Sequence, residues 1–427
     1  MMYGDKVLAM ILAGGRVDEL SVLTMNRPKA AVPFGGLYRV IDFPLSNLMH
    51  SGIERVGILS QYRPFSLMNH IGNGMAWDMV GRNRYIHFLP PFKGYKPSDW
   101  YRGTADAIYQ NLDYIQHGNP SLVMILSGDH IYKMNYLDLI RFHIDNEADV
   151  TIAFKEVPPN QASRFGQGVI EGMDEHGGPL KAYSEKARRP ISNWASLTIY
   201  LFKAEILYEI VEQLVGKERL FEFGRDILPR ILEDHRVFGY KFRGYWGYTR
   251  TIVEFYMTNM SLLGDQPEID PDAWMVRTNL EHRRIQDRPP AIVGKEAVVE
   301  NSLIYNGCRV YGQVRNSILF PGVYVAPDAV VQDSIIFFDS QVLERATVMQ
   351  TIIDTDVIIG QAAIIGRAGL PRLDGFRPHV KQSDLVLIGQ EAIVPAGITL
   401  SPGCLVYPST PELHFTKSNY EPGEEIQ

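Results

Sequence analysis

A six-residue recurrence of apolar side chains constrains the C-terminal part of this chain more than any other feature. The residues at this interval form two series: Ile318, Tyr324, Val330, Ile336, Val342 and Val348, then Ile352, Ile358 and Ile364. Related tripeptides beginning at Asn301, Asn316, Asp333 and Gln350 mark the length of one coil. The period suits neither an α-helix nor an alternating strand. It predicts a triangular parallel β-helix with each of these apolar residues pointing into the solenoid.

The first part of the chain instead alternates short apolar strands with helical segments. Predicted strands are Val7–Leu12, Arg55–Ser60, Leu122–Leu126, Val150–Val157 and Leu197–Phe202, and Thr104–Ile115 has helical spacing. This alternation favours an α/β domain with a mostly parallel sheet. The prolines and charges of 264–290 indicate a linker. We therefore predict an α/β domain over 1–263, a linker over 264–290 and a β-helix over 291–427.

Composition limits the classes of partner. The chain has 427 residues, a net charge of −7 and two cysteines, Cys308 and Cys404. An acidic balance gives no reason to expect a nucleic-acid or anionic membrane surface. So few cysteines suggest a reduced, cytoplasmic protein. No apolar run approaches the roughly 18 residues of a membrane helix, and the N-terminal residues lack the features of a signal peptide.

The segment from Leu8 to Gly36 has the features of a phosphate-binding turn. A buried strand ends at Leu12 and Ala13, and Gly14 and Gly15 follow at once. Glycines there let backbone N–H groups approach a phosphate, although a plain tight turn explains them equally well. Arg27 and Lys29 supply cations further along, unless they form only a solvated basic surface.

A second candidate site follows the predicted strand Leu122–Leu126. Asp129 stands after that strand, where a carboxylate could hold Mg²⁺ opposite a phosphate turn. The segment alone slightly favours the alternative that Asp129 caps a following helix. His130 is expected to make structural hydrogen bonds, because no second histidine is spaced for a metal site.

Two further motifs suit a nucleotide and a sugar phosphate. The segment Trp100–Ala107 places aromatic residues before Gly103, Thr104 and a helix, an arrangement that could support a flat base. Alternatively, either aromatic anchors the core, Trp100 more readily than Tyr101. Glu185 and Lys186 could bind hydroxyls and a phosphate, although such a pair is ordinarily a solvated surface feature.

Taken together, these motifs resemble the bacterial glucose-1-phosphate adenylyltransferase (ADP-glucose pyrophosphorylase) family over nearly the whole chain. Its signature runs roughly GGxGxRLxxLTxxRxKPAVxFGG, and the WYxGTADA, SGDHIYKMDY and EK motifs also have counterparts here. The resemblance implies a Rossmann-like (GT-A-like) nucleotidyltransferase domain followed by a left-handed parallel β-helix. It implies catalytic roles for Asp129 and Lys29, with Asp129 as the Mg²⁺ ligand. Nucleotide-binding residues would be Leu12, Ala13, Gly14, Gly15, Tyr101, Gly103 and Thr104, and sugar-phosphate-binding residues Gly166, Glu185, Lys186 and Ser196.

Departures from the family pattern concentrate where catalysis needs charge. Val17 replaces a glycine, Glu19 replaces the arginine that clamps the ATP phosphates, and Tyr248 replaces the second metal-binding aspartate. Loss of an arginine that stabilises phosphoryl-transfer charge can cost on the order of 10³–10⁵ in rate. Arg16 could replace the lost arginine, or Glu19 could recruit a metal ion; the sequence does not choose between them.

Three functions therefore compete at this point. The first is an adenylyltransferase that joins ATP and glucose-1-phosphate into ADP-glucose for glycogen or a related α-glucan. The second is a catalytically silent regulatory subunit, and the third is a nucleotidyltransferase for another sugar or base, which the retained motifs disfavour. The resemblance further implies a homo- or hetero-tetramer and small-molecule allosteric effectors. Asn26 stands where some relatives carry a basic activator contact.

Overall fold

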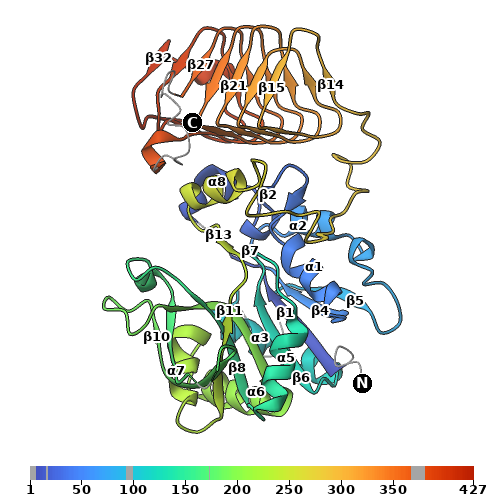
Figure 1. The fold of residues 1–427 in the computed structure, drawn as a ribbon, viewed down its shortest axis with the longest axis vertical. Coiled ribbons are helices and arrows are strands. Elements are labelled where there is room, and N and C mark those ends of the chain that lie inside the picture. The colour runs from blue at the N-terminus through green and yellow to red at the C-terminus, as the bar shows by residue number, and fades with distance from the viewer. Residues whose placement is uncertain (1–5, 16–17, 93–99, 173, 367–379) are drawn as a thin grey trace. The chain divides into compact units, whose positions relative to one another are not determined.

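The computed structural model describes residues 6–15, 18–92, 100–172, 174–366 and 380–427 (Figure 1). The chain forms two compact units. The first comprises 1–15, 41–64 and 71–246, and the second comprises 16–40, 65–70 and 247–427. Both units are therefore assembled from chain segments that are not contiguous. The predicted domain boundaries at 263 and 291 stay predictions.

A nine-stranded mixed sheet forms the centre of the first unit. Its strands, in spatial order, are β5 (Tyr85–Leu89), β4 (Arg55–Leu59), β1 (Val7–Leu12), β6 (Leu122–Ser127), β11 (Trp194–Lys203), β8 (Val150–Glu156), β12 (Val237–Phe242), β10 (Gly177–Glu185) and β9 (Gly166–Ile170). All of them run in one direction except β10 and β11. The mostly parallel α/β sheet is thus confirmed, and β1 has the predicted bounds.

Helices and shorter helical turns pack against this sheet. They are α1 (Asp42–His50), α3 (Thr104–Gln110), α4 (Leu112–His117), α5 (Tyr136–Asp145), α6 (Ala204–Ile210) and α7 (Leu228–Ile231), with π-helical turns at Val211–Lys217 and Phe223–Ile227. The single helix predicted over Thr104–Ile115 is wrong, because it breaks at Asn111. The Asn111 amide donates to the Ala107 carbonyl and to the Tyr101 hydroxyl, and its backbone leaves the helical region.

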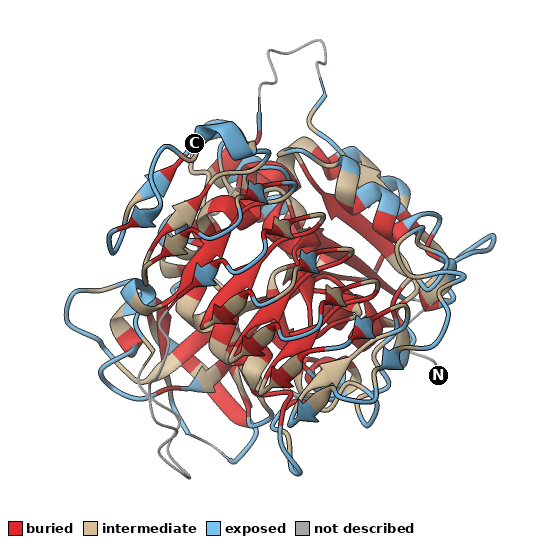
Figure 2. Ribbon diagram, turned by 90° about the horizontal axis from the view of Figure 1, so that it is seen from above, coloured by how far each residue is buried: buried red, intermediate tan, exposed pale blue. Residues whose placement is uncertain are grey.

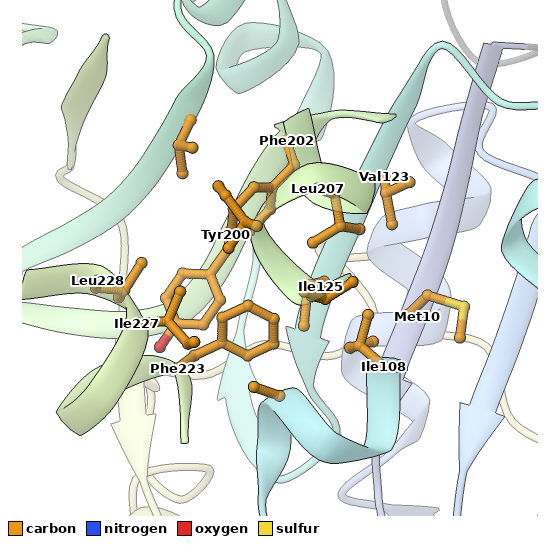
Figure 3. Close-up of a cluster of buried hydrophobic side chains, with 14 of the residues drawn as sticks. Met10, Ile108, Val123, Ile125, Tyr200, Phe202, Leu207, Phe223, Ile227 and Leu228 are labelled. Carbon is orange, nitrogen blue, oxygen red and sulfur yellow. The ribbon is translucent and has the colours of Figure 1, made fainter. Parts of the chain in front are cut away.

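Central strands of this sheet are buried along their length, as their uninterrupted apolar sequences require. Figure 2 colours each described residue of the structure by its burial. On one face, Tyr200 and Phe202 of β11 pack against Phe223, and Ile108 and Ile125 complete the layer (Figure 3). Aromatic pairs of this kind contribute beyond the area they bury. The core therefore fixes β11 beside β6, and with it the carboxyl end of β6.

His143 of α5 makes the stability of this unit depend on pH. The side chain is buried; its Nδ1 lies 2.8 Å from Thr151 Oγ1, while Nε2 has no hydrogen-bond partner. Burial, assisted by the charge of Lys203, lowers the pKa of His143 to about 4 from 6.5. Between these values the unfolded chain binds a proton that the folded chain does not.

We therefore expect the free energy of unfolding to fall by up to about 3 kcal/mol as pH decreases from about 6.5 to 4. Urea titrations at several pH values would measure this slope. The variant His143→Gln should reduce it, leaving the contribution of His282, whose pKa burial lowers to about 3, whereas His176→Gln, at an exposed histidine, should leave it unchanged. An unaltered slope in His143→Gln would contradict the assignment.

The second unit contains a left-handed parallel β-helix built from three sheets. The first sheet comprises β14 (Ile292–Val293), β17 (Arg309–Val310), β20 (Tyr324–Val325), β23 (Gln341–Val342), β26 (Ile358–Ile359) and β29 (Ile393–Val394). The second comprises β15 (Val298–Glu300), β18 (Gln313–Arg315), β21 (Val330–Gln332), β24 (Thr347–Met349), β27 (Ile364–Ile365), β30 (Thr399–Leu400) and β32 (Asn419–Tyr420). The third comprises β16 (Leu303–Ile304), β19 (Ile318–Leu319), β22 (Ile335–Ile336), β25 (Thr351–Ile353), β28 (Val386–Ile388), β31 (Leu405–Val406) and β33 (Glu425–Ile426). Every ladder is parallel, which confirms the predicted architecture.

The predicted inward register of the β-helix is only partly right. Ile336, Val342 and Val348 belong to the solenoid core as expected, but in the neighbouring coils the core residues are Leu319, Val325, Val331, Ile353, Ile359 and Ile365. Each lies one position after the predicted residue; Ile364, for example, is 41% exposed. The cause is a coil of 17 residues. A strict period of six therefore slips by one residue per coil.

One corner of the β-helix explains the repeated tripeptides. Asn316 and Asp333 adopt positive φ there, a conformation that Asn and Asp tolerate better than most residues. The hydroxyls that follow form a ladder, in which Ser317 Oγ accepts from the Ser334 N–H and Ser334 Oγ accepts from the Thr351 N–H, at 3.1 and 3.2 Å. This ladder satisfies backbone groups at a turn and holds consecutive coils in register.

The second unit also contains α8 (Ile252–Met260), the hairpin of β2 (Pro33–Phe34) and β3 (Tyr38–Arg39), and the 3₁₀ segments Asp18–Thr24 and Lys29–Ala31. Phe255 of α8 packs edge-on against Phe34 and against Phe337 of the β-helix. The Tyr305 hydroxyl donates to the Gly35 carbonyl at 2.7 Å. Residues 18–40 are thus held against the β-helix by packing and hydrogen bonds.

Two further observations concern the described residues as a whole. Among them, no helix is long and apolar enough to cross a membrane. Both cysteines, Cys308 and Cys404, are buried free thiols.

Candidate active site

The turns after β1 and β6 lie at the same edge of the sheet in the first unit. These strands are parallel neighbours in a register that pairs Leu12 with Ser127, and the Gly128 N–H donates to the Leu12 carbonyl at 3.0 Å. The Ala13 N–H donates to the Leu59 carbonyl of β4 at 2.9 Å. Backbone hydrogen bonds therefore bring together the two turns that the sequence singled out.

Gly14 and Gly15 differ in what surrounds them. A Cβ at Gly14 would lie 3.1 Å from the Gln61 backbone nitrogen, so that position is tightly packed. A Cβ at Gly15 would meet no described atom within 4 Å. Among the described residues, the turn is thus packed against its neighbours at Gly14 but not at Gly15, the side on which an anion could approach backbone N–H groups.

Asp129 follows β6 at this edge, and its side chain is 28% exposed. The Ser127 hydroxyl donates to Asp129 Oδ1, and His130 Nε2 lies 3.4 Å from the same oxygen. The residue does not cap a helix, because β7 (His130–Tyr132) comes next and Asn135 caps α5. His130 itself packs edge-on against Trp246. The helix-cap alternative is therefore excluded, and Asp129 is an accessible carboxylate beside the β1 turn.

Of the two aromatic residues before α3, Tyr101 is buried and Trp100 is exposed, which is the opposite of the expected order. Trp100 is 67% exposed, whereas Tyr101 is 9% exposed. The Tyr101 hydroxyl donates to the Leu89 carbonyl at 2.8 Å and accepts from the Asn111 amide. Burial raises the pKa of Tyr101. Tyr101 is thus fixed in position by hydrogen bonds, and the expectation that Trp100 is the more ready core anchor is wrong.

Gly103 and Thr104 are tied to the segment around Glu222. A Cβ at Gly103 would lie 2.3 Å from the Phe221 carbonyl, so only glycine fits there. The Thr104 hydroxyl donates to Glu222 Oε2 at 2.9 Å and accepts from the Phe223 N–H at 3.1 Å. These contacts hold the first residues of α3 against the segment around Glu222. The Thr104 hydroxyl takes part in two of them, once as donor and once as acceptor.

Glu185 lies at the end of β10 against two glycines. A Cβ at Gly166 would lie 2.6 Å from Glu185 Oε2, and one at Gly224 would lie 2.4 Å from the same atom. The Tyr183 hydroxyl donates to this oxygen at 3.0 Å, and Lys186 Nζ lies 4.0 Å from Glu185 Oε1. Gly166, Glu185 and Lys186, which the sequence grouped as a sugar-phosphate site, are therefore neighbours.

Ser196 lies on β11 just before an irregular stretch. It is 7% exposed, and the strand pairing shifts register between Ser196 and Tyr200. Thr198, which replaces a glycine of the family pattern, has φ +54°. A β-branched residue rarely adopts a positive φ, so the backbone at Thr198 keeps a conformation that suits glycine.

Lys29 belongs to the second unit, where it is 2% exposed. Its Nζ lies 5.5 Å from the centre of the Tyr248 ring, within range of a cation–π interaction. Tyr248 stands where the family pattern has its second metal-binding aspartate. An aromatic face thus takes the place of a carboxylate beside the retained lysine.

Two other residues of the second unit differ in charge from the family pattern, and they form an ion pair. Arg250 Nε donates to Glu19 Oε1 at 2.9 Å, across 231 residues of sequence. Both residues depart from the family pattern, which has arginine at position 19 and glycine at position 250. The complementary charges of Glu19 and Arg250 were the signal that could have linked the two positions. Arg16 and Val17 lie outside the described residues.

The donor groups fit Mg²⁺ better than a structural metal. Among the described residues, no group of three or more His, Cys, Asp or Glu side chains could hold an ion. Mg²⁺ commonly binds one or two carboxylates and completes its shell with substrate phosphates and water. Asp129 alone, next to a turn suited to phosphates, meets that description.

Comparison with known proteins identifies the family. Residues 8–264 match the nucleotidyl transferase family model, and residues 289–388 match the GlmU-like C-terminal hexapeptide model. The chain is 38% identical to the glucose-1-phosphate adenylyltransferase of Acetivibrio thermocellus, over 100% of this chain and 98% of the relative. It is 39% identical to the enzyme of that name from Desulfitobacterium hafniense, over 94% and 98%, and 40% identical to that from Bacillus mycoides, over 91% and 100%. The chain belongs to the glucose-1-phosphate adenylyltransferase family.

Proposed function

We propose that this protein transfers the adenylyl group of ATP to glucose-1-phosphate in glycogen or related α-glucan synthesis. The products are ADP-glucose and pyrophosphate. The observation that carries the proposal is the edge where the β1 turn meets Asp129, because Gly128 and Leu12 are directly hydrogen-bonded there. Full-length similarity to adenylyltransferases supports the choice of substrates.

The reaction is a substitution at the α-phosphorus of ATP. A phosphate oxygen of glucose-1-phosphate forms the new bond to that phosphorus, and the bond to the leaving pyrophosphate breaks. The contribution of the chain is positioning and charge. Lys186 pairs with the sugar phosphate and Glu185 accepts hydrogen bonds from glucose hydroxyls. The backbone N–H groups of Gly14 and Gly15 offset phosphate charge, and Lys29 keeps the catalytic role that the family resemblance implies.

The remaining assignments belong to the same proposal. Leu12, Ala13, Tyr101, Gly103 and Thr104 border the nucleotide, and Gly166 and Ser196 border the sugar. Mg²⁺, held by Asp129 and by phosphates, offsets charge on the triphosphate when bound. We further propose a cytoplasmic tetramer that small-molecule effectors regulate.

A direct test is pyrophosphate release by the purified protein with ATP, glucose-1-phosphate and Mg²⁺. We expect turnover on the order of 1 s⁻¹ or more, the range of ordinary enzymes. The triple variant Glu19→Arg, Tyr248→Asp, Arg250→Gly restores the family residues and should keep this turnover or raise it. Omitting glucose-1-phosphate is the control. Absence of turnover in the unmodified protein would contradict the proposal.

A second function is favoured by the contacts of Tyr248 and Glu19. The Tyr248 ring contacts Lys29 where a metal-binding carboxylate is expected, and Glu19 brings negative charge to a position that normally binds phosphate. These contacts suit a catalytically silent regulatory subunit that assembles with an active relative. In the same assay, this function predicts no turnover in the unmodified protein and a gain on the order of 10³-fold or more in the triple variant.

A further inference from the structure

A tyrosine on the same strand holds Glu185, the carboxylate proposed to contact the sugar. Tyr183 and Glu185 are two residues apart in β10, so their side chains lie on the same face of the strand. The Tyr183 hydroxyl donates to Glu185 Oε2 at 3.0 Å. One oxygen of the carboxylate is therefore engaged by a neighbour within the first unit.

Tyr183 is itself fixed by the core of this unit. It is 7% exposed, and its ring packs against Phe154 of β8, with the ring centres 6.4 Å apart. Burial raises the pKa of Tyr183, and the neighbouring Tyr200 and Glu185 raise it further. The hydroxyl therefore keeps its proton near neutral pH and donates it to the hydrogen bond with the carboxylate.

Two glycines confine the same pair of side chains. A Cβ at Gly166 would overlap the Tyr183 hydroxyl, and a Cβ at Gly224 would overlap Glu185 Oε2. Gly166 is also the partner of Glu185 in the ladder between β9 and β10. Backbone thus packs directly against the hydrogen-bonded pair, which leaves little room for another rotamer of Glu185.

The second oxygen of the carboxylate lies on the side of Lys186. Glu185 Oε1 is 4.0 Å from Lys186 Nζ, and the two side chains are 27% and 49% exposed. The Lys186 N–H donates to the Phe165 carbonyl at 3.0 Å, which ties the backbone at this point. A carboxylate accepts from hydroxyls and an ammonium pairs with a phosphate. An accessible carboxylate beside an accessible ammonium therefore suits a ligand that carries both hydroxyls and a phosphate.

We infer that Tyr183 is a positioning residue for sugar recognition: by holding Glu185 Oε2, it presents Oε1 to a hydroxyl of the sugar phosphate. A carboxylate that is already ordered in its binding geometry loses less conformational entropy when the ligand binds. The inference rests on the proposed sugar site, and it holds for a catalytically silent protein as well, because it concerns binding.

The test is calorimetric titration of the full-length protein with ADP-glucose, and in parallel with ADP, which lacks the sugar. Loss of a hydrogen bond to a charged group costs a factor of about 10–100. Because Tyr183→Phe keeps the carboxylate itself, we expect ADP-glucose affinity to fall by about 10-fold and ADP affinity to stay within about twofold. Equal loss for both ligands, no loss for either, or no binding of ADP-glucose by the unmodified protein would overturn the inference.

A double-mutant cycle separates positioning from general damage to the fold. If Tyr183 acts through Glu185, Tyr183→Phe should change ADP-glucose affinity by less than about twofold in a protein that already carries Glu185→Ala. A hydroxyl that contacts the ligand itself, or that only supports the fold, would cause the same loss in both backgrounds, and that result would refute the positioning role.

Tyr256→Phe is the matched control for removal of a buried tyrosine hydroxyl. Tyr256 is 3% exposed, and its hydroxyl donates to the Asp333 carbonyl at 2.7 Å in the second unit. This variant should lower the thermal stability and leave ADP-glucose affinity unchanged. A loss of ADP-glucose affinity in Tyr256→Phe as large as that in Tyr183→Phe would show that the effect is not specific to Glu185.

The outcomes separate this inference from the proposed function. Lack of pyrophosphate release together with ADP-glucose binding that depends on Tyr183 would reject the enzyme activity and keep the inference. Normal turnover with ADP-glucose binding that does not depend on Tyr183 would do the reverse.

Discussion

Replacing Asp354 by asparagine should lower the free energy of unfolding of this protein by about 3–5 kcal/mol. Asp354 is fully buried and pairs with Arg27, which is 7% exposed. Arg27 Nε also donates to the Leu23 carbonyl, and Asp354 Oδ1 accepts from the Thr355 N–H at 2.7 Å. Without the carboxylate, the guanidinium would keep its charge in a place that water does not reach, and that penalty dominates the loss.

Urea unfolding of the full-length protein, followed by circular dichroism, would measure the effect. Asp356→Asn is a matched control on the same coil, because Asp356 is 35% exposed and its partner Arg284 also pairs with Asp339. We expect it to cost about 1 kcal/mol or less. A double replacement, Arg27→Met with Asp354→Leu, should lose less than Asp354→Asn. Equal losses in Asp354→Asn and Asp356→Asn would show that burial is not the cause.

The second large effect concerns catalysis. Asp129→Asn should lower the rate of pyrophosphate release by about 10²–10³-fold, the usual loss when one preorganised electrostatic contact is removed. The amide keeps the shape of the side chain and can still accept from the Ser127 hydroxyl, but it loses the negative charge that favours Mg²⁺.

The rate should be measured over a range of Mg²⁺ concentrations, and the variant should need more Mg²⁺ to reach half of its maximum rate. Asp138→Asn, at an exposed carboxylate of α5, is the control and should leave both quantities unchanged. Full activity in Asp129→Asn at low Mg²⁺ would remove Asp129 from the proposed metal site.

Features with strong periodicity could be predicted from the sequence, because local pattern and buried environment agree there. The bounds of β1 follow from six consecutive apolar residues, and the β-helix follows from its recurring apolar positions. The tripeptides at Asn316, Asp333 and Gln350 already carried the coil length of 17 residues, but a strict period of six contradicts that spacing, and the assumed period placed several core residues one position too early. The helix break at Asn111 depends on the Tyr101 hydroxyl, a contact that helical spacing does not reveal.

The candidate site also contains residues that the sequence could place and residues that it could not. Sequence alone linked Gly14 to Asp129 through a rule about strand ends, and the β1–β6 register confirms that their turns share an edge. The burial of Trp100 and Tyr101 depends on tertiary partners such as Leu89, and was predicted in the wrong order. The Glu19–Arg250 pair joins residues 231 positions apart, so only the fold could bring them together.

Assembly of the second unit from three chain segments has a consequence for dissecting the protein into fragments. A fragment ending near residue 263 would separate Arg27 from Asp354 and Gly35 from Tyr305. A fragment beginning near residue 264 would expose Phe337, which Phe255 covers in the intact chain. Neither piece would be a self-sufficient module, so genetic exchange of one half between relatives would succeed only when residues 18–40 and α8 are inherited together with the β-helix against which they pack.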